Sequence, residues 1–185
     1  MAPILVNKTH PLPEDYADSV ELVETVDCRG KKAFVEKETW EAFQKLRGAL
    51  EAQGVSVFFG SNFRTVREQE EVIRRLTEKY GEEYARKTAA PPGTSEHHTG
   101  LALDLAPLED GEWVTENMAL MKPVRLWEKV HAALPAFGFI LRYPEGKEEI
   151  TGYGYEPWHI RYVGKEAAEK ISQSGLTLEE YLEAL

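Results

Sequence analysis

The sequence predicts an α+β domain with a small, mostly antiparallel sheet and flanking helices. The chain has 185 residues, a length that fits one ordinary domain. Its strand-like and helix-like segments are mixed without the alternation that builds a parallel sheet. Hydrophobic residues make up 42% and charged residues 29%, as in a globular domain rather than a disordered chain. We therefore expect one domain over 1–185, with 1–36 as an N-terminal wrap and 165–185 as C-terminal helices.

The first third of the chain contains three kinds of pattern. Residues 1–36 are rich in turn formers, so an irregular segment with two short strands is expected there. Apolar residues recur at spacings of three and four from Trp40 to Leu50, which predicts an amphipathic helix over 37–53. The β-branched and aromatic residues that follow, over 55–59, predict a strand.

The remaining elements follow from the same periodicities. They are a helix over 65–80, a strand that ends at 105, a helix over 123–135, strands over 138–143 and 155–163 around a glycine-rich hairpin at 146–154, and two closing helices. Thr177 and Glu180 have the spacing of a capping box for the last helix. In the strand that ends at Leu105, large residues alternate with small or polar ones. Leu103 and Leu105 should therefore face one side of the sheet and Asp104 the other.

Composition and charge exclude several classes of function. The net charge of −10 argues against a protein that binds the nucleic-acid backbone, which needs clustered Lys and Arg. The single cysteine, Cys28, excludes an internal disulfide framework and any cysteine-rich metal site. No apolar run approaches the roughly 20 residues of a membrane span, and the N-terminus lacks the apolar stretch of a secretory signal.

Two of the five histidines have a spacing that favours metal binding. A histidine taken alone is more often structural, because ligation needs converging partners. His97, however, lies in a loop shortly before Asp104, so the chain can fold one side chain back toward the other, and His159 lies in a second strand-like segment. Two imidazoles and one carboxylate would complete three of the four positions of zinc and leave the last for water. The sequence thus predicts a zinc site in a cleft on the sheet.

Two separated motifs resemble a known family. They are Ser95-x-His97-x-x-Gly100-x-Ala102-x-Asp104 and Glu156-Pro-Trp-His159-x-Arg-Tyr-Val-Gly164. Together they are similar to the VanY-type D-alanyl-D-alanine carboxypeptidases, zinc peptidases of peptidoglycan that also include L,D-carboxypeptidases. The segment Ser61-Asn-Phe-Arg64-Thr-x-x-x-Gln69 resembles a third stretch of the same family, with departures at Asn62 and Phe63, and His98 is a further departure.

The resemblance implies His97, Asp104 and His159 as zinc ligands and Glu156 as the catalytic base. In a regular strand, residues 156 and 159 would face opposite sides, because their separation is odd. Pro157 relieves this difficulty, since proline occurs at strand starts and bulges, and we expect the chain to bend there. Without a ligand three positions later, Glu156 would be interpreted as a solvated surface carboxylate.

Three further residues are expected to bind substrate. A carboxypeptidase must hold a free terminal carboxylate, and Arg64 suits this because a guanidinium binds carboxylates through two parallel hydrogen bonds. The alternative for Arg64 is a surface salt bridge. Ser95 and Gln69 are expected at the substrate as well, Ser95 as a turn or cleft hydrogen-bonder. His98 is expected to line the cleft or contact substrate rather than the metal.

These residues lead to a functional expectation with open alternatives. We expect a zinc-dependent carboxypeptidase that uses metal-activated water to remove the C-terminal D-alanine from peptidoglycan stem peptides or muropeptides. The alternatives are an L,D-carboxypeptidase on tetrapeptide stems, a D-Ala-D-Ala dipeptidase, for which no dedicated acid to capture an ammonium group is evident, and a non-catalytic module that binds wall peptides. Glu156 favours an enzyme over the module. The cell envelope is the expected location if a leader was removed, and the cytoplasm if the chain is full length. Oligomeric state stays open.

Overall fold

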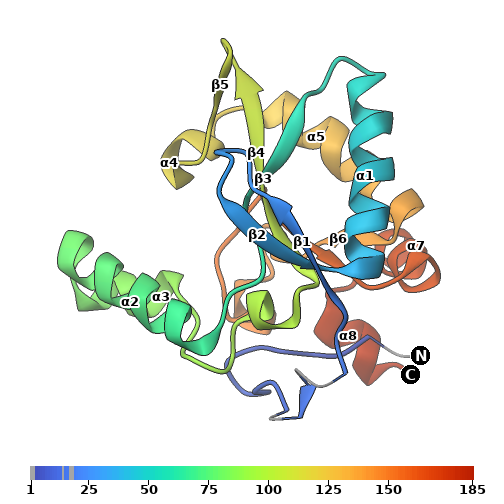
Figure 1. Cartoon of the computed structure of the whole chain (residues 1–185). Helices are drawn as coiled ribbons and strands as arrows, with labels where there is room; N and C mark the ends of the chain where they lie inside the picture. The colour runs from blue at the N-terminus through green and yellow to red at the C-terminus, as the bar shows by residue number, and fades with distance from the viewer. Residues whose placement is uncertain (1–2, 14, 17–18) are drawn as a thin grey trace.

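The computed structural model describes residues 3–13, 15–16 and 19–185 (Figure 1). It contains a five-stranded antiparallel sheet of order β3-β4-β7-β6, with β5 paired to β4, and a separate ribbon of β1 and β2. The strands are β1 Leu22–Val26, β2 Lys32–Glu36, β3 Val57–Ser61, β4 Ala102–Glu109, β5 Glu112–Trp113, β6 Phe139–Leu141 and β7 His159–Tyr162. The α+β class and the two short strands expected within 1–36 are confirmed. Residues 1–2, 14 and 17–18 of that expected wrap lie outside the described residues.

Helices flank the sheet. They are α1 Lys37–Glu51, α2 Val66–Tyr80, α3 Glu82–Thr88, α4 Asn117–Leu120, α5 Val124–Ala133, α6 Glu148–Thr151, α7 Lys165–Ser174 and α8 Leu178–Glu183, with 3₁₀ turns η2 Glu96–Thr99 and η3 Leu134–Phe137. The hairpin predicted at 146–154 is wrong, because α6 occupies its centre. The strand predicted over 155–163 is shorter than expected and begins only at His159. A single helical turn such as α6 carries too few residues to show a 3.6-residue period.

One face of the sheet is covered by α1 and α5. Phe43, Leu46 and Leu50 of α1 are fully buried in the same apolar cluster as Leu103 and Leu105 of β4, and Trp127 of α5 also belongs to that cluster. Leu103 and Leu105 thus face the core, as their alternation predicts. Helices α2 and α3 lie side by side in Figure 1, at the end of the molecule away from α1. This arrangement leaves the other face of β4 free to carry polar residues.

Strand register aligns polar residues across three strands. Asp104 of β4 is directly opposite Ser61 of β3 on one side and opposite His159 of β7 on the other. The pairing of β3 with β4 is irregular between Phe59 and Ser61, so Gly60 is an extra residue in β3. Such a bulge re-aims the side chains that follow it. The row from Ser61 to His159 forms the floor of the site described below.

The two ends of the chain pack together beneath β6. Leu5 of the N-terminal segment contacts a buried cluster that includes Ile140 of β6, Ile171 of α7 and Leu178 of α8. The capping box predicted for the last helix is present, since Thr177 and Glu180 exchange side-chain and backbone hydrogen bonds. Among the residues that the structure describes, no helix has the length and apolar character needed to cross a membrane.

Candidate active site

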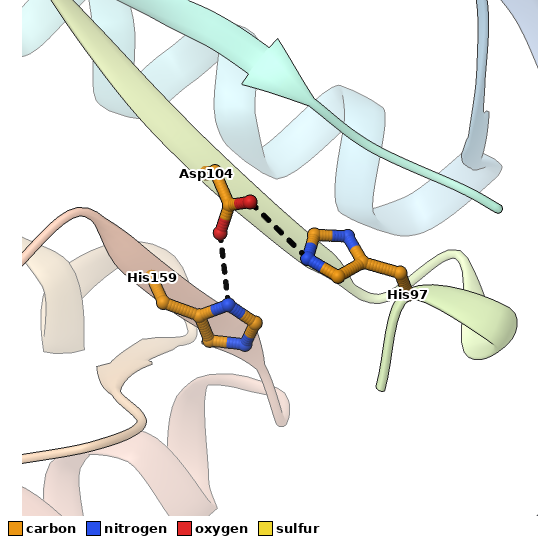
Figure 2. A group of neighbouring side chains, drawn as sticks. All are labelled: His97, Asp104 and His159. Atoms are coloured by element: carbon orange, nitrogen blue, oxygen red, sulfur yellow. Dashed lines mark hydrogen bonds and ion pairs between the residues drawn. The ribbon is translucent and has the colours of Figure 1, made fainter. Parts of the chain in front are cut away.

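The structure brings His97, Asp104 and His159 together (Figure 2). Each imidazole faces a different oxygen of the carboxylate: Nε2 of His97 lies 3.3 Å from Oδ2 of Asp104, and Nδ1 of His159 lies 2.9 Å from Oδ1. When one ligand atom is taken from each residue, the three atoms all lie within 4.8 Å of one another. Both histidines are buried, and the carboxylate is partly open to solvent. The three side chains therefore form a compact donor set at the edge of a cleft.

Local structure explains how a loop histidine reaches the strand. His97 lies in η2, which Ser95 caps by accepting a hydrogen bond from the backbone amide of His97. Gly100 then turns the chain into β4 with a left-handed backbone, φ 73°. A side chain at Gly100 would also stand 2.9 Å from Leu22 and 3.1 Å from the backbone of Glu36. Both conformation and space thus require glycine at this position.

The hydrogen bonds of the histidines define which nitrogen of each faces Asp104. Nδ1 of His97 is 2.8 Å from the carbonyl of Asn62, and because a carbonyl only accepts, Nδ1 must carry the proton and Nε2 is left with its lone pair. Burial lowers the pKa of His97, which favours the neutral ring that a metal needs. His159 is oriented the other way, with Nδ1 toward Asp104.

The electrostatics of this group fit a divalent cation. Burial by itself raises the pKa of Asp104, but His97 and His159 hold it well below its ordinary range. Burial alone lowers the pKa of His159, yet the carboxylates of Asp104 and Glu96 raise it to about 10. The carboxylates of Asp104 and Glu96 thus stabilise positive charge at this site. Two imidazole nitrogens and one carboxylate are also donors that zinc prefers. These residues fit the metal that the sequence predicted.

Glu156 stands beside the donor set. Its Oε2 is 3.9 Å from Nδ1 of His159, and about a fifth of its side chain is exposed. The chain turns at Pro157 and Trp158 before β7 begins, which is the predicted bend, and His131 of α5 contacts the Pro157 carbonyl at 2.8 Å. Burial, with a smaller contribution from Asp104, raises the pKa of Glu156 to about 7 against the attraction of His159. Glu156 is therefore half-buried in the cleft and is not a solvated surface acid.

Arg64 lines the same cleft, and its guanidinium has only neutral hydrogen-bond partners. Its Nη1 donates to Oε1 of Gln69 at 2.6 Å and its Nη2 donates to Oγ of Ser61 at 2.8 Å. No ion pair involves Arg64 among the parts of the chain that the structure describes, so the surface salt bridge considered from the sequence is not formed. Burial lowers the pKa of Arg64, although nearby Asp104 opposes this. A half-buried guanidinium without a carboxylate is suited to an anionic ligand.

Two residues near Arg64 bond to other parts of the protein. Gln69 is buried behind Arg64, with its amide oxygen taken by the guanidinium and its nitrogen bonded to the carbonyl of Ala90, and it is not among the cleft-lining residues. Both ends of its amide are thus bonded to protein groups, and the contact of Gln69 with substrate stays a prediction. His98 does not line the cleft either: Nδ1 bonds the Arg64 carbonyl and Nε2 accepts from Gly93. Ser95 does line the cleft.

The cleft has a volume of about 430 Å³ and is lined by the donor set, Glu156 and Arg64. This volume is in the range of small-ligand sites. Tyr153 also lines it, and its buried hydroxyl has no hydrogen-bond partner among the described residues. Sequence reasoning missed Tyr153 as an individual cleft residue and missed Glu96. The available signal for Glu96 was the pair Arg142 and Arg161 within apolar strand segments, because buried arginines require a buried acid.

Two histidines and a carboxylate that meet at a small antiparallel sheet, beside a further half-buried acid, are an arrangement that metal-dependent hydrolases use. Residues 32–165 match the family described as VanY: D-alanyl-D-alanine carboxypeptidase. The chain belongs to this family.

The chain is also similar to individual relatives. It is 37% identical over 183 residues to the putative carboxypeptidase YodJ of Bacillus subtilis and 39% identical over 191 residues to the D-alanyl-D-alanine carboxypeptidase of Enterococcus faecalis. These matches cover 97% of the chain but only 66% and 65% of the relatives, so the chain spans about two thirds of their length.

Solved structures are similar over nearly the whole chain. A mutant of the vancomycin-resistance D,D-pentapeptidase VanY in complex with Zn(II) superposes with a TM-score of 0.81 at 38% identity, over 97% of each chain. VanYB in complex with D-alanine-D-alanine gives 0.79 at 39% identity, over 97% of this chain and 96% of that one. The LD-carboxypeptidase LdcB gives 0.81 at 36% identity, over 97% and 84%.

Proposed function

We propose that this protein is a zinc-dependent carboxypeptidase that removes the C-terminal D-alanine from peptidoglycan stem peptides. The observation that carries the proposal is the meeting of one donor set, one half-buried acid and one unpaired arginine in a single cleft. Membership of the VanY family, the Zn(II) complex of VanY and the D-alanine-D-alanine complex of VanYB support the metal and the substrate class.

In this proposal zinc is held by Nε2 of His97, a carboxylate oxygen of Asp104 and Nδ1 of His159. When bound, zinc polarises the scissile carbonyl and lowers the pKa of a water toward about 7. Glu156 takes the proton from that water and delivers it to the departing amine. Its place next to His159, half-buried and free of any cationic side chain other than His159 among the described residues, supports this role.

Arg64 binds the terminal carboxylate of the substrate. The guanidinium faces the cleft and has no competing acid among the described residues, and two parallel hydrogen bonds from it match a carboxylate. Gln69 and Ser61 each accept a hydrogen bond from the guanidinium and hold it in place. Ser95, at the cleft wall, is proposed as a hydrogen-bonder to substrate. Recognition of the free terminus makes the enzyme an exopeptidase.

We further propose that residues 1–185 act as one peptidase domain. The packing of Leu5 against the cluster of α7 and α8 supports this, because it joins the N-terminal segment to the C-terminal helices in one apolar cluster. Peptidoglycan stem peptides or muropeptides are the proposed partner, which places the action at the cell envelope.

A second candidate is an L,D-carboxypeptidase that acts on tetrapeptide stems. The likeness to LdcB, with a TM-score of 0.81, favours it specifically, because that LD-carboxypeptidase is as similar in fold as VanY. The two activities differ in the residue before the cleaved bond, which the zinc ligands and Arg64 do not contact in the proposed arrangement. A D-Ala-D-Ala dipeptidase and a non-catalytic wall-peptide module remain as further outcomes of the same test.

Mass spectrometry of products tests the proposal. The purified protein, loaded with zinc, is incubated separately with a pentapeptide stem that ends in D-Ala-D-Ala and with a tetrapeptide stem. Loss of one alanine from the pentapeptide supports the first candidate, and loss of one alanine from the tetrapeptide alone supports the second. Free D-Ala-D-Ala is the dipeptidase substrate in a third reaction. Binding without any product in all three reactions would identify the module and overturn the enzyme.

Metal analysis tests the ligand set independently of substrate. The wild type should bind about one zinc per chain, and His159→Ala should lose most of it, because all three ligands act together in one site. His98→Ala is a matched control, since His98 is buried close to His97 but both its nitrogens bond to backbone groups. Undiminished zinc in His159→Ala would remove this residue from the site.

A further inference from the structure

A second buried carboxylate contacts His159 from the side opposite to Asp104. Oε2 of Glu96 lies 3.3 Å from Nε2 of His159, while Oδ1 of Asp104 lies 2.9 Å from Nδ1 of the same ring. The imidazole is thus held between two acids, one on each nitrogen. Glu96 is only 2% exposed, so water does not compete for this contact.

Glu96 is itself held rigidly by two arginines. Its other oxygen, Oε1, accepts from Nε of Arg142 at 2.7 Å and from Nη1 of Arg161 at 2.6 Å, and neither arginine is exposed. Arg142 is anchored further by both carboxylate oxygens of Glu179, at 2.9 and 2.6 Å. Arg161 also donates to the carbonyl of Ile4 at 2.7 Å. A carboxylate that is fixed in this way has one free oxygen, and that oxygen faces His159.

We propose that Glu96 is a positioning residue that orients the imidazole of His159 so that Nδ1 faces the metal site. A carboxylate can only accept, so the Nε2 that it contacts must carry a proton. In a neutral ring the lone pair is then on Nδ1, the nitrogen next to Asp104. Acids that hold the second nitrogen of a ligand histidine raise its affinity for metal. Glu96 acts through His159 and does not touch substrate.

The packing around the ring supports the same conclusion. Tyr143 lies against His159 with 4.8 Å between ring centres, and His97 approaches it edge-on at 5.2 Å. These contacts restrict the ring, and the hydrogen bond to Glu96 determines which nitrogen points to Asp104. The charges of Glu96 and Glu179 balance those of Arg142 and Arg161, so a purely structural role in charge balance is the alternative that an experiment must separate.

Glu96→Gln separates the two roles. The two guanidiniums select the amide oxygen of the new side chain, and the NH₂ group is then directed at Nε2 of His159. A donor at that position favours an unprotonated Nε2, which moves the ring proton to Nδ1 and blocks the nitrogen that faces the metal. Glu179→Gln is the matched control: it removes the same charge from the same cluster and contacts Arg142, but it does not contact His159.

The measurement is zinc affinity by competition with a chelator, with thermal unfolding of the metal-free proteins alongside. The inference rests on the proposed function only through its metal site. We expect Glu96→Gln to bind zinc about 10–100-fold more weakly than wild type, the range found for outer-shell partners, and Glu179→Gln to stay within about threefold. If Glu96→Gln does not fold, Glu96→Asp replaces it, since the shorter acid keeps the charge for the arginines but withdraws from His159. Equal affinity in wild type and the Glu96 variants would overturn the inference, as would an equal loss in Glu179→Gln.

A measurement on the wild type completes the test. In the zinc-loaded protein, nitrogen-resolved NMR of labelled histidine should show a slowly exchanging proton on Nε2 of His159, because that proton is buried against Glu96. A proton absent from Nε2 would overturn the inference even if zinc is bound. A wild type that binds no zinc at all would overturn the metal site itself, so that failure is distinct from the failure of Glu96 as its positioning residue.

Discussion

Charged side chains lie on two sides of His159, and the two groups differ in how they are paired. The buried group consists of Glu96, Arg142, Arg161 and Glu179, in which every charge contacts an opposite charge. The cleft group consists of Arg64 and Glu156. Arg64 contacts neutral side chains, and Glu156 has only His159, at 3.9 Å, as an ion partner among the described residues.

This difference teaches which charges are available for chemistry. A buried charge without an opposite partner opposes folding, so a fold that keeps one has a use for it. A paired and buried charge is already satisfied and cannot bind a ligand without losing its partner. Substitutions in the cleft group should therefore change activity with little effect on stability. Substitutions of the paired arginines in the buried group should mainly lower stability, whereas Glu96 should affect both, because its second oxygen contacts His159.

The largest effect is expected at Glu156. Glu156→Gln keeps the shape of the side chain but cannot accept the proton of the attacking water, so turnover should fall about 10²–10⁴-fold, the usual contribution of general base catalysis. Zinc content and thermal stability should stay near those of wild type. Steady-state kinetics on the stem peptide that the wild type cleaves would measure this. Near-normal turnover would assign the proton transfer to a different group and break the distinction between the two groups.

Arg142 should give the largest loss of stability. Arg142→Met retains the volume of the side chain but leaves Glu96 and Glu179 with one fewer cation, and breaking a buried ion pair in this way costs about 3–5 kcal/mol of unfolding free energy. Urea unfolding would measure the loss. Arg64→Met is the control from the cleft group and should change stability by less than about 1.5 kcal/mol, since it removes hydrogen bonds to two neutral partners only. Equal losses would show that pairing does not distinguish the two arginines.

Arg64 should determine the preference for a free terminus. If it binds the terminal carboxylate, the wild type should discriminate against the same peptide with an amidated terminus by about 1–3 kcal/mol, which is the cost of an unpaired buried group. Arg64→Ala should remove most of that preference, and Arg64→Lys should restore only part of it, because an ammonium has charge but no two-pronged geometry. Kinetics on a matched acid and amide pair would measure this. Equal cleavage of both peptides by the wild type would indicate an endopeptidase.

The outline of the site was predictable because its residues are close in sequence to strong local signals. His97 and Asp104 belong to one short motif, and Pro157 indicated the bend between Glu156 and His159. The alternation of Leu103, Asp104 and Leu105 predicted which face carries the acid. Short elements such as α3, α4 and α6 were missed, because four to seven residues rarely show a periodicity.

Long-range partners were not predictable from local patterns. Glu96 contacts Arg142 and Arg161, which are 46 and 65 positions away in sequence. Their meeting depends on the register of β7 with both of its neighbours, and that register becomes evident only when the sheet is formed. The bond from Gln69 to Arg64 has the same origin, because the position of Ala90 fixes which way the amide points.

The smallest effect is expected at the ion pair of Arg29. This residue lines the cleft as Arg64 does but is paired with an acid as Arg142 is, so it tests the comparison most sharply. It forms an ion pair of 2.7 Å with Asp27, which also accepts from the backbone amides of Arg29 and Lys31. Burial alone raises the pKa of Asp27, but these partners outweigh burial and lower it.

A lowered pKa in the folded state means that the charge of Asp27 stabilises the protein above the ordinary pKa of about 3.9 and that this contribution is lost as the pH falls through the folded value. Asp27→Asn should therefore destabilise the protein by about 1 kcal/mol at pH 7, the net worth of one hydrogen bond, and the difference from wild type should shrink below about pH 4. Urea unfolding of both proteins across this range would show it. The turnover of Asp27→Asn at pH 7 should change little, because Arg29, the partner of Asp27, is expected to contribute to the fold and not to substrate binding. A large loss of turnover with unchanged stability would place Arg29 with Arg64 in the cleft group, and pairing would then no longer predict which arginine serves the substrate.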